Sequence, residues 1–245
     1  MKKRFFLVLI IQSAVSYSQT AITSANFQEA INTCLATNPV DGLCSTSEFG
    51  AMPDWDVSNV TDMSRAFHQK ILFNGDLSAW NVSNVTDMTA LFNAAFSFNQ
   101  DISTKEITVG ENTFIAWDVS NVNNMAGMFL QAKVFNGNIS NWDTSNVTNM
   151  NSMFKMAYLF NQPIGEWETS SVTNMPDLFS EAYSFNQDLN SWDVSQVTDM
   201  SYMFESAESF NGAISNWSIN TNAVTMSGMF DDSGLSKNNF DALLI

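Results

Sequence analysis

The sequence is poor in basic residues and in histidine, and both shortages exclude classes of function. Of its 245 residues only nine are Lys or Arg, against 25 Asp or Glu, so the formal net charge is −16. Nucleic acids and anionic membranes are bound through clustered Lys and Arg, so we expect neither as a partner. A hydrolytic triad needs His or Lys beside a nucleophile, and the chain has one His. The charge instead favours cations or basic protein surfaces.

The sequence also lacks an apolar run long enough for a good membrane span. The longest run covers residues 5–14 and follows three basic residues at 2–4. Ser16 and Ser18 occupy the two positions that a signal peptidase reads, so we predict a signal peptide over residues 1–18. Its removal leaves six basic and 25 acidic residues, a charge of −19. We expect a secreted or cell-surface protein without a membrane span after cleavage; an N-terminal anchor helix is the alternative.

Cysteine is nearly absent, and Cys34 and Cys44 are the only two. In an exported chain a pair this close predicts a disulfide. Two thiols and a distant His68 make no tetrahedral set, so a metal site is the weaker interpretation. We expect residues 19–54 to form an N-terminal cap with an amphipathic helix and, at its start, a capping box of Asn26 and Glu29. The predicted apolar face of that helix is Phe27, Ala30, Ile31, Cys34 and Leu35.

What the sequence has in abundance is aromatic residues at a fixed spacing. Seven Trp follow one another at steps of 25 residues, with a single step of 37. A Met stands eight residues after each of the first six Trp, a Phe twelve after, and a Phe-Asn pair eighteen and nineteen after. A period of about 20–50 residues is the signature of stacked repeats. We therefore predict a repeat solenoid over residues 55–230, of about seven turns. A partial C-terminal cap over 231–245 would follow, in a chain that we expect to be truncated. The tryptophans are Trp55, Trp80, Trp117, Trp142, Trp167, Trp192 and Trp217.

Each 25-residue unit predicts a short parallel strand followed by a short helix, which is an α/β fold class. Trp192 and Val194 alternate as on the inward face of a strand. The apolar residues that follow are spaced as one face of a two-turn helix. They are Met200, Met203, Phe204 and Ala207. We expect the Asn of each Phe-Asn pair to form a ladder that satisfies backbone groups of neighbouring turns.

The step of 37 residues contains an insertion of twelve near residues 103–114. Ile107 and Val109 alternate ahead of Gly110, which predicts a small hairpin projecting from the stack. Insertions in repeats map to loops and sometimes to binding faces. We favour a neutral excursion here, with a binding face as the alternative.

The unit [LI]-x-x-W-D-[VT]-S-x-V-T-[DN]-M-x-x-[ML]-F, followed by A-x-x-F-N, resembles the repeats of the BspA-like leucine-rich-repeat surface proteins. That family includes the mycoplasma-type surface-protein repeats of this length. The resemblance covers residues 55–230 and implies a leucine-rich-repeat-like solenoid in an exported, non-catalytic protein. It also implies a protein-binding or adhesion surface, with an extracellular, host or matrix protein as partner. The alternative is a glycan-binding module that uses the solenoid face.

The residue after each Trp is the candidate binding position, because it lies between two inward residues and should point outward. Carboxylates stacked along a ladder repel one another. A bound Ca²⁺ or a basic partner would compensate, but we favour neutralisation by mobile ions. We expect Asp62, Asp87 and Asp199, which belong to another column, to cap helices. The carboxylates of the candidate column are Asp56, Asp118, Asp143, Glu168 and Asp193.

Two chemical interpretations of the repeat are less favoured by its pattern. The Trp column would suit an aromatic platform for sugar rings, but its alternation with apolar residues favours a buried core. Paired carboxylates would suit a glycosidase, but nearly every acid belongs to a repeated column, whereas an active site is a unique constellation. We therefore predict no catalytic site and no cofactor other than the Ca²⁺ considered above.

Overall fold

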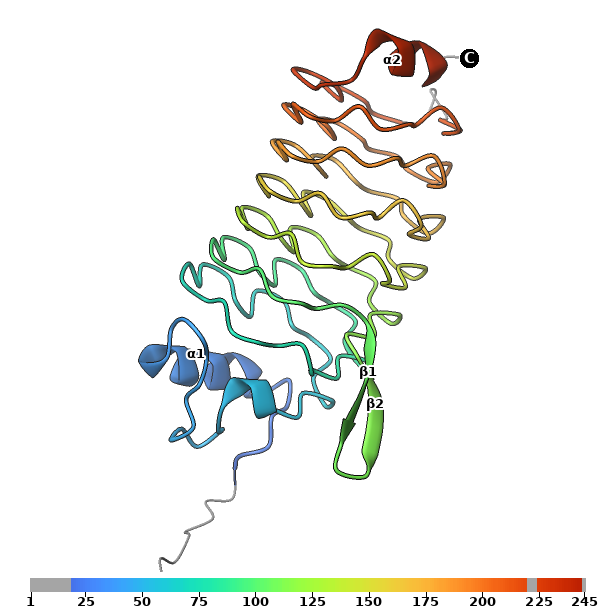
Figure 1. The fold of residues 1–245 in the computed structure, drawn as a ribbon. Helices are drawn as coiled ribbons and strands as arrows, with labels where there is room; N and C mark the ends of the chain where they lie inside the picture. Colours follow the sequence, from blue (N-terminus) through green and yellow to red (C-terminus); the bar gives the residue numbers. More distant parts are fainter. Residues whose placement is uncertain (1–18, 220–223, 244–245) are drawn as a thin grey trace, which may run out of the picture.

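The chain winds into successive coils that lie on one another along a single axis (Figure 1). The computed structural model describes residues 19–219 and 224–243, so the predicted signal peptide lies outside the described residues. Within those ranges no helix has both the length and the apolar character needed to cross a membrane. The helices and strands are α1 (Phe27–Thr37), the 3-10 helix η1 (Met52–Asp54), β1 (Lys105–Val109), β2 (Asn112–Ala116) and α2 (Lys237–Leu243).

The core is a set of continuous columns of aromatic rings running through the stack. Ring centroids of successive Trp residues from Trp117 to Trp192 lie 6.1, 6.3 and 6.5 Å apart in near-parallel planes. Two Phe columns run beside them, and Phe129 lies 3.9 Å from Phe135 of the same coil and 5.6 Å from Phe154 of the next. Burial of these rings removes a large apolar area from water and is the main stabilising contribution.

All seven Trp side chains are at most 5% exposed, which confirms that they are core. Each indole N–H donates to a backbone carbonyl, so none is buried without a partner. Trp142 donates to Ile102 at 2.9 Å and Trp192 donates to Ile164 at the same distance. An exposed Trp platform for sugars is therefore not present.

The backbone between these rings differs from the expected strand and helix. Residues 200–207 form a ribbon of turns in which Tyr202 and Ser206 have φ of 57° and 53°, values that no α-helix contains. The N–H groups of Met200, Tyr202 and Phe204 donate to carbonyls of the next coil at 2.8–2.9 Å. Those groups are therefore not free for the bonds within the segment that a helix requires.

The expected parallel strand at each Trp is not formed either. Coils instead join through single parallel bridges seven residues after the Trp, such as those from Asn149 to Asn174 and from Asn174 to Asp199. The alternation read from the sequence still gives the right directions, because Trp192 and Val194 are buried while Asp193 is exposed.

The Asn ladder is confirmed. The side-chain oxygen of Asn136 accepts the backbone N–H of Asn161 at 2.9 Å, and that of Asn161 accepts the N–H of Asn186 at 2.9 Å. The same bond links every pair of neighbouring coils from Asn74 to Ser236. Each amide thus satisfies a backbone donor of the following coil, which fixes the register of the stack.

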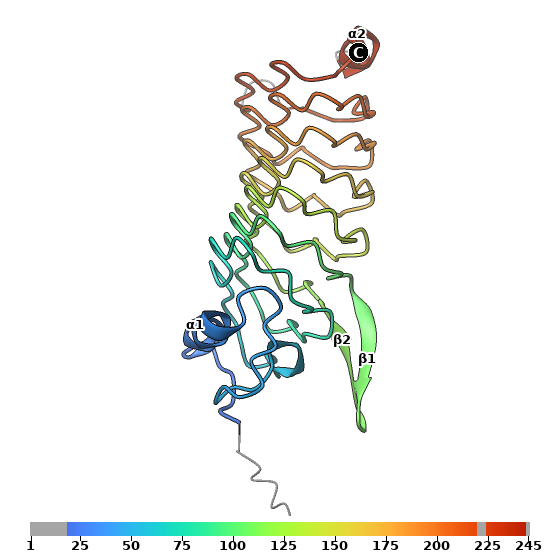
Figure 2. The same ribbon diagram turned by 60° about the vertical axis from the view of Figure 1, so that its left-hand side comes forward.

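The helix α1 lies beside the first coils, and α2 lies at the other end of the stack (Figure 2). The five residues of the predicted apolar face of α1 are buried, and the predicted Cys34–Cys44 disulfide is formed, with a Cα–Cα distance of 5.2 Å. The predicted capping box is absent. The side chain of Asn26 accepts the N–H of Thr23 at 2.8 Å and makes no bond to the helix start.

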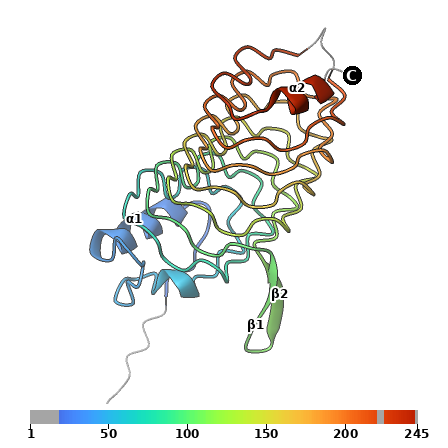
Figure 3. The same cartoon turned by 45° about the horizontal axis from the view of Figure 1, so that its top comes forward.

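The twelve-residue insertion forms the predicted hairpin, in which β1 and β2 pair antiparallel with Ile107 opposite Phe114. The hairpin leaves the stack and projects from it (Figure 3). Gly110 begins the two-residue loop with φ of 63°, as a tight hairpin turn with Gly in its first central position requires.

Candidate functional site

The predicted acidic column lies on the outside of the coils, and each of its side chains closes a local turn. Asp56 accepts the backbone N–H of Ser58 at 3.0 Å, and Asp193 accepts that of Ser195 at 2.9 Å. Asp118, Asp143 and Glu168 accept the N–H two residues later in the same way. Asn81 occupies this column without a charge and makes the same bond at 3.2 Å. The position therefore requires a hydrogen-bond acceptor rather than a carboxylate.

The turn bond also acts on the titration of Asp193. The backbone N–H and the side chain of Ser195 stabilise the charged form of Asp193 and hold the pKa of its carboxyl below the ordinary value of 3.8. Partial burial opposes this shift and is the smaller effect. A side chain engaged with its own backbone has one oxygen fewer to offer to a ligand.

A second polar column, which includes Asp62, Asp87 and Asp199, stands at the bridges between coils. These carboxylates accept the N–H two residues later at 2.7–2.9 Å, so they cap turns and not the helices that the sequence predicts. Across the part of the chain that the structure describes, no three His, Cys, Asp or Glu side chains are grouped so as to hold a metal ion. Ca²⁺ binding by the acidic column therefore stays a prediction.

A different surface gathers exposed apolar side chains. It consists of the two residues before each Phe-Asn pair, and we call it the apolar edge. Leu159 is 52% exposed and Tyr183 is 36% exposed on this edge. Its other apolar members in the described coils are Ile71, Leu72, Phe96, Val134 and Tyr158.

The aromatic members of the apolar edge are stacked along the coil axis. The rings of Tyr158 and Tyr183 lie 4.8 Å apart in near-parallel planes. The ammonium group of Lys133 lies 4.6 Å from the centre of the Phe96 ring and 5.7 Å from that of Tyr158, which is cation–π geometry. Partial desolvation and the carboxylate of Glu181, which accepts the phenol hydroxyl at 3.2 Å, raise the pKa of Tyr183. One face of each Tyr ring is thus engaged with the other ring, and the hydroxyl of Tyr183 is engaged with Glu181.

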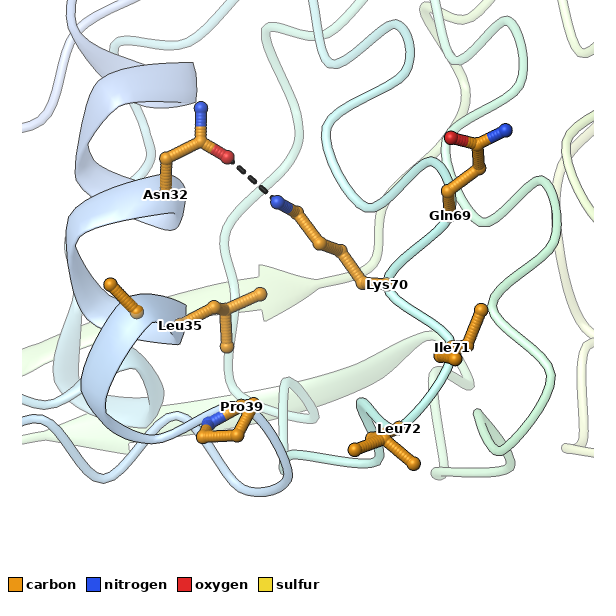
Figure 4. A pocket seen from close by; sticks show the side chains of 8 residues that line it. Asn32, Leu35, Pro39, Gln69, Lys70, Ile71 and Leu72 are labelled. Atoms are coloured by element: carbon orange, nitrogen blue, oxygen red, sulfur yellow. Dashed lines mark hydrogen bonds between the residues drawn. The ribbon is translucent and has the colours of Figure 1, made fainter.

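The apolar edge reaches a pocket of about 360 Å³ between α1 and the first coil. Leu35 and Pro39 line one wall, and Ile71 and Leu72 of the edge line the other (Figure 4). The Nζ atom of Lys70 donates to Asn32 of α1 at 2.8 Å and bridges the two walls. Sequence analysis missed this edge because its residues change from coil to coil. The edge could have been predicted from the apolar residues that precede several of the Phe-Asn pairs, at positions where the repeat itself is not kept.

A family model described as "Mycoplasma protein of unknown function, DUF285" matches residues 43–143, 105–217 and 137–242. The chain belongs to this DUF285 family. The three matched stretches overlap, as expected when one model fits a repeating unit in several registers. Comparisons with curated proteins and with solved structures gave no match for the chain.

Membership in the DUF285 family covers nearly all of the stacked coils, and the family description assigns no activity. The resemblance to BspA-like leucine-rich-repeat proteins stays a prediction beside it. The evidence on the function of this DUF285 chain therefore lies in the surfaces that its coils expose.

Proposed function

We propose that this DUF285 protein is an exported, non-catalytic binding or adhesion protein built on a leucine-rich-repeat-like solenoid, and that its apolar edge contacts a partner protein. The observation that carries the proposal is that each coil buries its recurring residues and exposes variable ones. The recurring Trp, Met and Phe residues are buried, while the apolar edge exposes side chains that differ between coils.

The composition of the apolar edge supports a protein partner. Tyr and Phe are enriched in the cores of protein interfaces, where they bury a large area and lose little side-chain entropy. An exposed apolar strip is costly in water and is typical of surfaces that are covered in use. Glycan binding through stacked sugars is less favoured, because the Trp rings are buried and Tyr158 and Tyr183 each use one ring face to stack on the other.

Export and the absence of catalysis are parts of the same proposal. Export is supported by the pattern of residues 1–18 and by the Cys34–Cys44 disulfide, a bond typical of proteins in oxidising compartments. A non-catalytic role is supported by the repeated acids, since the five of the predicted column each close a turn of their own.

The test is binding of the mature chain, residues 19–245, to a panel of immobilised extracellular-matrix proteins. The edge variant Leu159→Ser/Tyr183→Ser should weaken binding about tenfold or more, as loss of central apolar contacts does. The matched control Leu43→Ser/Tyr202→Ser removes side chains of comparable exposure, 54% and 41%, from outside the edge. The control should bind within about twofold of the unchanged chain. Equal binding by the edge variant, or no binding to any member of the panel, would contradict the proposal.

A further inference from the structure

Only part of the inner face of the β1–β2 hairpin packs against the core. Register places Ile107 opposite Phe114 and Val109 opposite Asn112 on one face of the hairpin. Ile107 and Phe114 pack against the core. Val109, two residues further towards the tip, is 61% exposed. Because Val109 is on the packing face and is still exposed, the hairpin is separated from the coils at this position.

The gap between the hairpin and the first coils is a groove of about 510 Å³, which we call the hairpin groove. The hairpin wall carries the apolar side chains of Val109 and Phe114 beside the polar Asn112 and Thr113. The other wall carries two exposed carboxylates at the end of η1 and at the start of the first coil. The residues that matter are Val109, Asn112 and Phe114 on the hairpin wall, and Asp54, Asp56 and Ser58 on the coil wall.

The hairpin groove differs from the rest of the acidic surface because it occurs once. The acidic column repeats in most coils, but the hairpin is inserted in one coil only, and of the five predicted carboxylates Asp56 alone lines the groove beside it. Asp56 uses its Oδ1 atom for the N–H of Ser58. Neither Asp54 nor Asp56 has an ion-pair partner in the described part of the chain.

We propose that the hairpin groove binds an arginine side chain presented by a basic segment of a partner protein. The side chain of arginine has an apolar stem and a planar cation, and the groove offers two apolar side chains, Val109 and Phe114, opposite two carboxylates. The guanidinium group pairs with carboxylates and stacks on aromatic rings, and Phe114 supplies a ring in the same wall. The charge of the mature chain favours approach of a basic segment. This site goes beyond the proposed function and does not depend on the apolar edge.

The probe is the peptide acetyl-Gly-Gly-Arg-Gly-Gly-amide, and its comparison is the same peptide with citrulline, which keeps the shape and removes the charge. Both are titrated into the ¹⁵N-labelled mature chain at low salt, and amide shifts in the spectrum report the place and the affinity of binding. The arginine peptide should shift the amides of Val109, Asn112 and Ser58 in a saturable way. The citrulline peptide should leave them in place.

Two pairs of variants separate the groove from general attraction to an acidic protein. Asp54→Asn/Asp56→Asn should weaken binding of the arginine peptide about tenfold, because it removes both groove charges. Asp143→Asn/Asp193→Asn removes the same charge from coils away from the hairpin and should change the affinity by less than about twofold. Val109→Ser should weaken binding, whereas Ile115→Ser on the outer face of β2 should not.

Each contrary result overturns the proposal. Equal losses from the two carboxylate pairs would show general electrostatic attraction, and equal binding of the citrulline peptide would show that the cation is not recognised. Saturation without groove shifts would place the peptide elsewhere. None of these results bears on the matrix-binding test, which uses the apolar edge.

Discussion

The polar residue after each of the first six Trp accepts a backbone hydrogen bond that closes a turn in its own coil. One coil has an uncharged residue at this position, so the contribution of the charge can be judged within the same chain. Asn81 makes the turn bond that the carboxylates make in the other coils. An uncharged acceptor is therefore sufficient for the fold. The negative charge of the column is therefore not needed for the turn, and it can act on charged molecules at the surface.

A substitution at Asp143 separates the acceptor from the charge. Asp143→Asn should change the free energy of unfolding by less than about 0.5 kcal/mol, because the amide oxygen can still accept the N–H of Ser145. Asp143→Ala should cost about 0.5–1 kcal/mol, because that N–H loses its partner. Urea unfolding of the three chains measures both values. Equal destabilisation by both variants would show that the charge itself holds the turn.

The lowered pKa of Asp193 predicts how this residue responds to acid. Its pKa in the folded state lies below the ordinary 3.8, so the unfolded chain binds the proton first as the pH falls. The stabilisation is complete above 3.8 and is lost as the pH falls through the folded-state value. Asp193→Asn cannot titrate, so its stability should fall less steeply with acid. Urea midpoints measured from neutral pH downward would test this, and parallel curves for the two chains would contradict it.

At the scale of an element, the sequence predicts which side chains are buried better than it predicts the path of the backbone. Met200, Met203, Phe204 and Ala207 are all buried, as the helical spacing indicates, yet they belong to a ribbon of turns. Apolar spacing reports which residues face the core. It does not report whether an N–H bonds within its segment or to the next coil, and here the stacked coil supplies the acceptors.

The aromatic core, the Asn ladder, the disulfide and the hairpin were predictable because each depends on spacing that recurs or on a local turn signal. The hairpin groove was not predictable, because Asp54 and Val109 are distant in the chain and meet only when the hairpin lies against the first coils. The apolar edge was hidden for a related reason. Its members share a place in the coil but not a residue type.

Deletion of the hairpin tests whether it is an addition to an intact stack. Removing residues 105–116 joins Thr104 to Trp117, and the resulting Ile-Ser-Thr-Trp matches the Ile-Ser-Asn-Trp that ends at Trp142. The deletion also removes the need for the φ of 48° that Trp117 adopts as the chain leaves the hairpin. That conformation costs on the order of 1–3 kcal/mol in a bulky residue and offsets the lost packing of Ile107 and Phe114.

The shortened chain should therefore unfold in one cooperative step, with a free energy of unfolding within about 2 kcal/mol of the full chain. Thermal unfolding followed by circular dichroism measures this. The same chain should no longer bind the arginine peptide. Loss of cooperative unfolding would show that the hairpin is an essential part of the stack.

At the scale of the whole molecule, few of the acidic side chains in the described ranges are paired with a basic side chain. All 25 acidic residues lie in the described ranges, and three of them form ion pairs, which leaves 25 − 3 = 22 without one. The cations in those pairs are Lys105, Lys155 and Lys237. Lys133 lies over aromatic rings, and Lys70 donates to Asn32. Repulsion among the remaining carboxylates therefore opposes the compact state and is screened by mobile ions.

Salt should stabilise this protein by screening its charges, and CaCl₂ should stabilise it by the same screening and not by specific binding of Ca²⁺. Raising NaCl from about 0.01 M to about 0.15 M shortens the screening length from about 30 Å to about 8 Å, so the melting temperature should rise. Because the described residues contain no grouped metal ligands, CaCl₂ and MgCl₂ at equal ionic strength should raise it equally. Differential scanning calorimetry of the mature chain in the three salts measures the effect. A saturable increase specific to Ca²⁺ would show that the stacked carboxylates bind the ion after all, since mobile ions screen according to their charge and concentration and not their identity.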